Sequence, residues 1–416
     1  MDEKWEKHAD KSLDKLVSDI IKSVELPERT GDASSRPDLK ALKEAGSELW
    51  LDTGDHDAAE KNWRAELSGL TTNNTLANQV VQKGIYDSVI SKAADELKSN
   101  ASSLKKEDLV VEVGFVVNAI ISSSLVSRFE AHVSVELHPS VANDVDATVM
   151  FGKRYFAIDP ENFYVKVPLT PAGVIAVRKL TEEGVKVNFT LGFSARQNHL
   201  ISRISRPTFL NVFLGRDNQV VIENKIGDGK NIGERATLAS QNDILSARAD
   251  GITDTRQIAA SLREGEQVKT LAGVDVLTIP PGVIEKFYGL NYDPESLAPR
   301  LDADLPVETT EPGMEVLWEI SDKFRAMTEA LAKEDISSMT PARMVDFIND
   351  NGVDNLFGKY DAADINTIRA KGKIPDLSQW AGRGMAVDDL LTSSALEAFA
   401  KDQEELDARI AGFVKK

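Results

Sequence analysis

Eight short apolar segments within residues 47–288, separated by stretches of helical periodicity, are the feature that most constrains the fold of this chain. Strand and helix signals that alternate in this way are typical of βα units, and eight parallel strands close a (β/α)₈ barrel. The predicted strands cover residues 48–52, 67–71, 132–136, 163–168, 185–191, 208–213, 255–260 and 274–279. The sequence therefore predicts an α/β fold, a TIM barrel with additional helices at both ends.

Helices are predicted between the strands and on either side of the barrel. Those within it cover residues 76–100, with a break near Gly84, and 106–127, 171–183, 231–249 and 259–270. Helices are also expected over residues 4–24 and 37–45, and after a loop or linker at residues 291–312 that is rich in Pro and acidic side chains. The chain is thus divided into an N-terminal helical extension (1–46), a catalytic barrel (47–290) and a linker with C-terminal helices packing on the barrel (291–416).

The composition limits the chemistry of the chain. It contains no Cys, which excludes disulfides, thiolate metal sites and cysteine nucleophiles. A formal charge of −18 repels nucleic acid and anionic lipid, so neither partner is expected, and a bound anion requires a local basic cluster. We expect no membrane-spanning segment and a location in the cytoplasm. The five histidines show no metal-ligand spacing and are interpreted as surface or loop residues, so no metal site is expected.

Polar residues inside the apolar strands are informative, because alternate residues of a barrel strand face the interior. Half-exposed strands with one face in water would explain a single case, but the strands of a parallel barrel are covered on both faces. The residues predicted to face inward are Asp52, Ser134, Glu136, Lys166, Lys186, Asn188 and Thr190. Active sites of such barrels lie at the carboxyl ends of the strands, where we expect the functional part of this set.

Lys166, the one charge in the strand at 163–168, is the candidate nucleophile. Apolar walls strip its hydration, which favours the neutral amine that attacks a carbonyl carbon; a lysine extended from the strand end into water is the alternative. Iminium chemistry needs proton transfer, for which Asp52 and Glu136 are candidates, although either could cap a helix or form an ion pair. Arg216 and Arg263 follow late strands, where phosphate is often bound, although a surface arginine explains either alone.

Several segments resemble the transaldolase family, a class of Schiff-base-forming aldolase-type barrels. They are residues 51–55 (LDTGD), 69–76 (GLTTNNTL), 133–136 (VSVE), 165–168 (VKVP), 183–194 (EGVKVNFTLGFS), 213–216 (FLGR), 260–263 (ASLR) and 399–406 (FAKDQEEL). The resemblance runs in order from about residue 47 to residue 410. The helices before residue 47 and a helical insertion at about residues 319–380 are additions to the family pattern.

The resemblance implies a transaldolase of the pentose phosphate pathway that needs no cofactor. A dihydroxyacetone unit would pass from sedoheptulose 7-phosphate or fructose 6-phosphate to glyceraldehyde 3-phosphate or erythrose 4-phosphate, carried on Lys166 as a Schiff base. Asp52 would remove a hydroxyl proton, and Glu136 with Thr190 would order the water that makes and hydrolyses the iminium. The sugar phosphate would be bound by Asn73, Asn188, Asn211, Phe213, Arg216 and Arg263. A homodimer is one assembly that remains open.

Three positions depart from or refine the family pattern. Asn74 stands where the family usually has Pro, which is expected to loosen the loop after Asn73. Asn211 replaces an expected substrate-binding Ser, which could shift substrate preference. The related fructose-6-phosphate aldolases tend to have Tyr where this chain has Phe213, and Phe favours transfer over release. The alternatives left open are an aldolase that releases dihydroxyacetone, and a non-catalytic barrel scaffold whose added helices are the working part.

Overall fold

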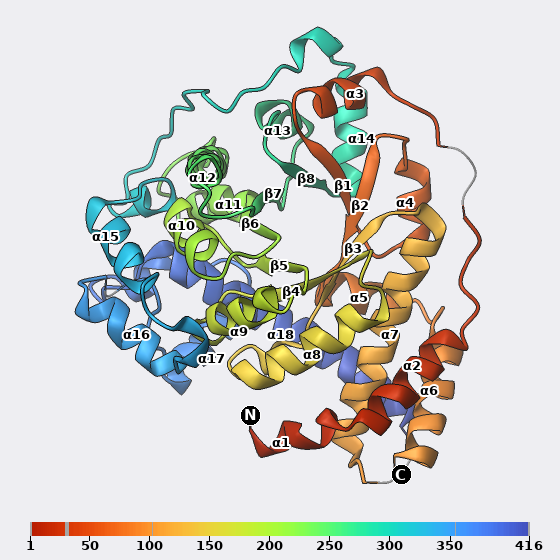
Figure 1. Cartoon of the computed structure of the whole chain (residues 1–416). Helices are drawn as coiled ribbons and strands as arrows, with labels where there is room; N and C mark the ends of the chain where they lie inside the picture. The colour runs from red at the N-terminus through yellow and green to blue at the C-terminus, as the bar shows by residue number, and fades with distance from the viewer. Residues whose placement is uncertain (1, 30–32, 102, 354, 415–416) are drawn as a thin grey trace.

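The predicted barrel is present in the structure, a computed structural model that describes residues 2–29, 33–101, 103–353 and 355–414. Within these residues, eight parallel strands close into a barrel in sequence order (Figure 1). They are β1 (Glu48–Asp52), β2 (Leu67–Thr71), β3 (His132–Glu136), β4 (Phe163–Pro168), β5 (Val187–Thr190), β6 (Phe209–Phe213), β7 (Arg256–Ala260) and β8 (Val276–Ile279). The first four have the predicted bounds, and the last four begin one or two residues later than predicted.

Helices connect the strands around the outside of the barrel. They are α4 (His56–Asn62), α5 (Asn74–Gln82), α6 (Asp87–Asn100), α7 (Lys106–Phe129), α8 (Val145–Ile158), α9 (Pro171–Glu182), α10 (Ala195–Ile204), α11 (Leu214–Glu223), α12 (Ile232–Ala249), α13 (Gly265–Thr270) and α14 (Pro281–Leu290). Gly84, with φ +80°, separates α5 from α6 as predicted. The helix predicted over residues 259–270 is wrong in its first half, because residues 259 and 260 end β7 and Ser261 has a left-handed backbone with φ +67°.

A layer of aromatic side chains fills the interior of the barrel toward the amino ends of the strands. Trp50, Tyr164 and Phe209, from three different strands, pack with ring centroids 4.9 to 5.8 Å apart. Gly69 leaves room for the indole, since a Cβ at that position would lie 2.6 Å from it. The next inward residues along the strands are polar and face the carboxyl end of the barrel, so the layer forms a floor beneath them.

A buried ionic cluster joins the N-terminal helices to the barrel. These helices are α1 (Glu3–Glu6), α2 (Lys11–Lys22) and α3 (Pro37–Glu44), and the helix predicted over residues 4–24 is interrupted before α2. Glu112 of α7 is fully buried and accepts two hydrogen bonds from Arg154, at 2.8 and 2.6 Å. His8 Nδ1 lies 2.6 Å from the same carboxylate, and Arg154 also pairs with Asp14 at 2.7 Å. The expectation that the histidines lie at the surface is wrong for His8, because a buried carboxylate holds it inside.

Helix α7 contradicts the expectation that no segment is long and apolar enough to span a membrane. It has 24 residues, and its most apolar window has a mean hydropathy of 2.0. The protein buries 78% of that window, where residues such as Val113, Val117 and Ile121 pack in the core. Such burial is typical of the core helix of a folded domain, and one helix of this kind is weak evidence for a membrane span.

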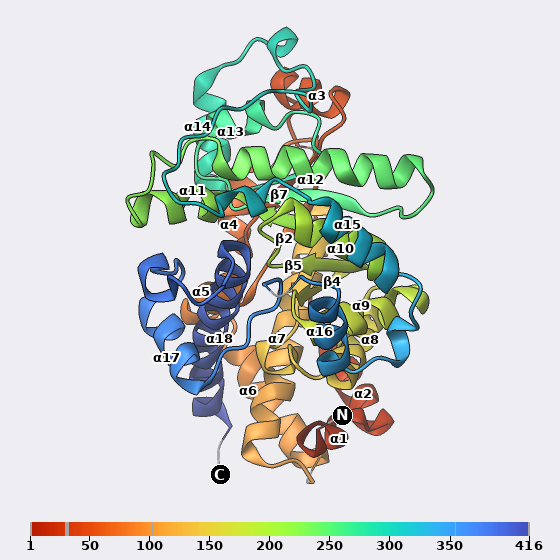
Figure 2. The same ribbon diagram turned by 90° about the vertical axis from the view of Figure 1, so that its left-hand side faces the viewer.

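The C-terminal part of the chain covers one side of the barrel. Residues 291–312 have little regular structure, as predicted, and cross the outside of the barrel, where Thr310 N–H donates to the Ile226 carbonyl at 2.8 Å. Then follow the helices α15 (Asp322–Leu331), α16 (Pro341–Asp350), α17 (Ala362–Lys371) and α18 (Val387–Phe413). Helix α15 packs on α10, α16 on α9, and α18 on α5, α7 and α17 (Figure 2). The division of the chain at residues 46 and 290 stays a prediction.

Candidate active site

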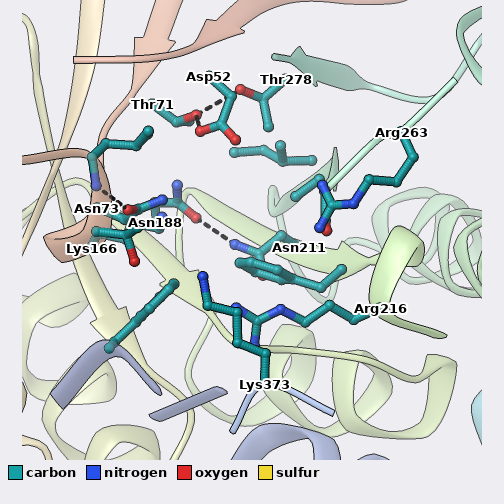
Figure 3. Close-up of a pocket in the computed structure, with 17 residues that line it drawn as sticks. Asp52, Thr71, Asn73, Lys166, Asn188, Asn211, Arg216, Arg263, Thr278 and Lys373 are labelled. Carbon is teal, nitrogen blue, oxygen red and sulfur yellow. Dashed lines mark hydrogen bonds between the residues drawn. The ribbon is translucent and has the colours of Figure 1, made fainter. Parts of the chain in front are cut away.

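A cavity of about 120 Å³ opens at the carboxyl end of the barrel strands (Figure 3). Eight of the ten predicted site residues line it: Asp52, Asn73, Lys166, Asn188, Asn211, Phe213, Arg216 and Arg263. The other two, Glu136 and Thr190, are buried but do not line the cavity. Residues far apart in the sequence therefore meet in one place, because all the strands end at the same rim.

Lys166 occupies the middle of β4, in which every residue is buried. Its side chain is only 4% exposed, so the alternative of a lysine extended into bulk water does not apply. The Nζ atom donates a hydrogen bond to the Thr72 carbonyl at 3.1 Å. In the strand register Lys166 faces Glu136 of β3 and Asn188 of β5. An acid and an amide thus stand on neighbouring strands at the level of the amine.

Asp52 ends β1 and accepts a hydrogen bond from one threonine hydroxyl, which a second threonine contacts in turn. Thr71 Oγ1 donates to Asp52 Oδ1 at 2.6 Å and lies 2.7 Å from Thr278 Oγ1 (Figure 3). Burial raises the pKa of Asp52 above its ordinary value, although the charges of Lys166 and Arg263 and the hydrogen bond from Thr71 oppose the shift. A carboxyl group with a raised pKa is better suited to exchanging protons near neutral pH.

Glu136 and Thr190 lie behind the cavity wall. Glu136 accepts a hydrogen bond from the backbone N–H of Asn74 at 3.1 Å. Burial raises the pKa of Glu136, and Lys166 and the Asn74 N–H oppose that shift. Thr190 is fully buried, and its hydroxyl has no hydrogen-bond partner among the residues that the structure describes. Both groups sit next to the strand that carries Lys166, at the side rather than in the cavity.

A chain of amides lines the wall opposite Asp52. Asn211 Nδ2 donates to Asn188 Oδ1 at 3.2 Å, and Asn188 Nδ2 donates to Ser134 Oγ at 3.1 Å. Asn73 lines the cavity and also caps α5, since its Oδ1 accepts the Leu76 N–H at 2.8 Å. Asn211, where a serine was expected, is thus part of a connected amide wall that fixes the direction of both carboxamides.

Asn74 does not loosen its loop in the way its sequence position suggested. The residue is 2% exposed, and its side chain donates to the Leu137 carbonyl at 3.4 Å. Its backbone N–H holds Glu136, which a proline could not do, because proline has no N–H group. Asn74 in place of the family's usual proline therefore adds a hydrogen bond to Glu136, the candidate acid. The sequence alone did not reveal this bond.

The far end of the cavity is positively charged. Arg216, in the first turn of α11, lies 5.7 and 5.6 Å from the rings of Phe213 and Phe399. Burial and the charge of Arg263 lower the pKa of Arg216 to about 10. Its Nη1 is buried without a hydrogen-bond partner in the described chain, and neither arginine forms an ion pair there. Because buried guanidinium groups are normally paired, this end of the cavity is suited to an anionic ligand.

Sequence reasoning missed Lys373, which also lines the cavity. It belongs to the segment after α17, and nothing in its local sequence points to the barrel mouth.

The prediction for Lys186 is wrong in another way, because the side chain lies at the amino end of the barrel and not at the carboxyl end, where the cavity is. Its Nζ lies 5.7 Å from the ring of Tyr164 and donates to the Glu161 carbonyl at 2.8 Å, at the amino end of the barrel.

His199 is the second histidine whose expected surface position is wrong. It is 3% exposed, and its Nδ1 lies 2.9 Å from Asp243. Arg203 and Arg325 each pair with the same carboxylate, at 2.7 and 2.8 Å. Since Arg325 belongs to α15, this cluster attaches the C-terminal part to the barrel and has no place in the cavity.

The fold and the cavity together define a (β/α)₈-barrel enzyme whose site combines an amine, carboxyl groups and an anion-binding end. Comparison with known proteins agrees with this class. The model of the family described as transaldolase/fructose-6-phosphate aldolase matches residues 49–342. The chain belongs to this family, as its motifs indicated. The match includes residues 319–342, so the expectation that the whole of residues 319–380 is an addition to the family pattern is wrong for that first part, while residues 399–406, which also resemble the family, lie beyond the matched range.

Its similarity to individual relatives is moderate. The chain is 28% identical over 288 residues to a probable transaldolase of Dictyostelium discoideum, which covers 66% of this chain and 87% of that protein. It is 27% identical over 279 residues to a transaldolase of Prochlorococcus marinus, covering 64% and 81%. A probable transaldolase of Syntrophobacter fumaroxidans is 31% identical over 194 residues, 46% of this chain and 78% of that protein. All three similarities leave substantial parts of this chain unmatched.

Proposed function

We propose that the protein is a transaldolase that moves a dihydroxyacetone unit between sugar phosphates by way of a Schiff base on Lys166. The donor would be sedoheptulose 7-phosphate or fructose 6-phosphate, and the acceptor glyceraldehyde 3-phosphate or erythrose 4-phosphate. The observation that carries the proposal is the joint presence of a buried amine, a carboxyl group and unpaired arginines in one cavity. A ketose phosphate has a carbonyl group that the amine can attack and a phosphate that the arginines can bind.

The first half of the reaction breaks the donor. The Lys166 amine attacks the C2 carbonyl, and the carbinolamine loses its oxygen as water to form an iminium, with Glu136 and Thr190 handling protons and water. Asp52 then takes the proton of the C4 hydroxyl, the C3–C4 bond breaks, and its electrons move into the iminium to give an enamine. The shortened aldose phosphate leaves, and the dihydroxyacetone carbons stay on Lys166.

The second half runs in reverse on the acceptor. The enamine carbon attacks the aldehyde carbon, the new alkoxide takes the proton back from Asp52, and water hydrolyses the iminium to release the longer ketose. Asn73, Asn188 and Asn211 are assigned to the hydroxyls of the bound three-carbon unit. Arg216 and Arg263 are assigned to the phosphate, where desolvated charge-assisted hydrogen bonds are strong. No cofactor enters this scheme.

Borohydride trapping tests the covalent step. Incubation with fructose 6-phosphate and sodium borohydride should reduce the iminium to a stable amine, and peptide mass spectrometry should place the added three-carbon or six-carbon unit on Lys166. The Lys166→Met variant should give no adduct. Absence of an adduct in the unaltered enzyme would overturn the mechanism and would favour the scaffold alternative.

An aldolase that releases dihydroxyacetone is the second candidate, because the family includes fructose-6-phosphate aldolases. Phe213 lines the cavity and has no hydroxyl with which to help protonate the enamine, which favours transfer. A coupled assay without an aldose acceptor separates the two reactions. Slow release without acceptor and fast turnover with it support transfer, whereas equal rates would establish the aldolase.

The setting of the reaction remains part of the proposal. Sugar phosphates of this kind belong to the pentose phosphate pathway, and a cytoplasmic enzyme is expected. A homodimer is proposed only as the simplest symmetric assembly. Sedimentation of the purified enzyme over a range of concentrations tests it, and a single monomeric species throughout would exclude it.

A further inference from the structure

We propose that Lys373, in the C-terminal addition, is a third cation that binds the substrate phosphate together with Arg216 and Arg263. The inference rests on the proposed function, and it deepens it by assigning a substrate-binding role to a segment outside the family match. The addition would then complete the active site instead of only covering the barrel.

The backbone around Lys373 directs it to the cavity. Helix α17 is followed by Gly372, which has φ +91° and ψ −142°, a conformation that residues with a side chain rarely adopt. The chain therefore turns sharply just before Lys373, and its side chain reaches the cavity beside Arg216 (Figure 3). The next residue, Ile374, is 3% exposed and anchors the turn in the hydrophobic core.

The segment is also tied to the helix that carries Arg216. Asn224 directly follows α11, and its Nδ2 donates to the Pro375 carbonyl at 3.0 Å. Its Oδ1 accepts the Leu377 N–H at 2.9 Å, so one side chain satisfies both backbone groups. This two-point contact fixes the turn that bears Lys373 relative to α11, so that Lys373 and Arg216 are held as neighbours.

The positively charged side chains at this end of the cavity lack a neutralising carboxylate, which suits the site to an anionic ligand. Lys373, Arg216 and Arg263 form no ion pair with any carboxylate in the described parts of the chain. The carboxylates whose charges act on Arg216 are those of Asp402 and Glu136. Asp402 accepts a hydrogen bond from the Thr75 hydroxyl, and Glu136 accepts one from the Asn74 N–H.

Three clustered cations repel one another, and the burial of Arg216 adds to the cost. A phosphate dianion offsets both effects. Two planar guanidinium groups can grip its oxygens in fixed directions, while a lysine adds a mobile point charge. Lys373 is itself exposed, so it would hold the outer side of the phosphate and release it readily.

The experiment uses the full-length enzyme with Lys373→Met, Lys373→Arg and the control Lys371→Met. Lys371 ends α17 two residues earlier, is exposed, and does not line the cavity, so its loss changes net charge equally. The KM for erythrose 4-phosphate should rise about tenfold in Lys373→Met, with kcat little changed. A tenfold loss of affinity corresponds to the loss of one charged hydrogen bond that is partly exposed to water. Unphosphorylated erythrose should react equally well with all variants.

A second readout needs no turnover. Titration of inorganic phosphate by calorimetry should show about tenfold weaker binding in Lys373→Met, while Lys373→Arg and Lys371→Met bind like the unaltered enzyme. Asn224→Ala should reproduce part of the loss, because it frees the turn. Equal losses with phosphorylated and unphosphorylated erythrose, or unchanged phosphate affinity in Lys373→Met, would overturn the proposal. A failure of the Schiff-base mechanism would appear instead as absent trapping on Lys166 with the phosphate titration unaffected.

Discussion

Two buried arginines of this protein have nearly the same exposure and opposite electrostatic surroundings. Arg154 is 9% exposed and Arg216 is 6% exposed. Arg154 grips the carboxylate of Glu112 with two hydrogen bonds, and although burial opposes it, this pairing raises the pKa of Arg154. Arg216 has no ion-pair partner in the described chain, and burial lowers its pKa to about 10.

The difference in pairing separates charges that stabilise the fold from charges that are available to bind a ligand. A buried cation with its own carboxylate is neutralised on folding, and this pair also holds His8 and Asp14 of the N-terminal segment against the barrel. A buried cation without one costs folding free energy that only a bound anion recovers. The second arrangement persists where a ligand supplies the missing charge, which is why the cavity, and not the larger ionic clusters, is assigned to substrate.

Lys166→Met gives the largest expected effect, because Lys166 supplies the amine that is proposed to attack the substrate carbonyl. The turnover number should fall by at least about three orders of magnitude, since the variant has no amine to form the covalent intermediate. Its melting temperature should stay the same or rise, because an apolar side chain replaces a buried polar amine whose hydrogen bond is made to the Thr72 carbonyl. A variant with appreciable turnover would show that the covalent step lies elsewhere.

Matched substitutions of the two arginines sharpen the comparison. Arg154→Met should lower the free energy of unfolding by about 3–5 kcal/mol, because it leaves the Glu112 carboxylate buried and unpaired. Arg216→Met should not lower it, but should reduce kcat/KM for a phosphorylated donor by about a hundredfold. Urea unfolding and steady-state kinetics measure both. Equal destabilisation by the two changes would end the distinction.

The dependence of stability on pH should also differ between the regions. Burial raises the pKa of Glu112, but Arg154 and His8 outweigh it and hold the pKa below 4.5, so its stabilising effect is present above about pH 4.5 and is lost as the pH falls through its folded value. Burial raises the pKa of Asp52 above 3.8, so its effect is the reverse: stability is lost as the pH rises through that range.

Urea unfolding from pH 3 to 7 checks both signs. Glu112→Gln should flatten the loss of stability in acid, and Asp52→Asn should remove a loss that grows toward neutral pH. Changes of the same sign in both variants would contradict the assigned shifts.

Phe213→Tyr should give the smallest effect. A hydroxyl at this cavity position could help water protonate the enamine, so release of free dihydroxyacetone without acceptor should increase, by less than the roughly hundredfold typical of a well-placed general acid. Phe213→Leu serves as the control and should not increase release. An unchanged release rate in the tyrosine variant would remove Phe213 from the explanation of transfer.

The sequence predicted the barrel well, because parallel strands buried on both faces leave a strong local pattern and their order follows the chain. It also predicted the inward residues that period-2 alternation selects, such as Lys166 and Asn188. It could not distinguish the two ends of the barrel by phase alone, which is why Lys186 was grouped with them.

Long-range contacts between polar groups were beyond local patterns. The pairing of His8 with Glu112 joins positions more than a hundred residues apart, and nothing near either residue signals it. Lys373 reaches the cavity only because Gly372 turns the chain and Asn224 holds it. Such features depend on where an addition packs, which the sequence of the barrel does not encode.

A crystal structure of the borohydride-reduced adduct formed from fructose 6-phosphate would be the most direct test of the cavity's assigned roles. We expect the six-carbon adduct to show a covalent bond from the substrate C2 to Lys166 Nζ, with the phosphate contacted by Arg216, Arg263 and Lys373. An adduct on another lysine, or a phosphate directed into solvent away from both arginines, would contradict the proposal that these unpaired cations await the substrate.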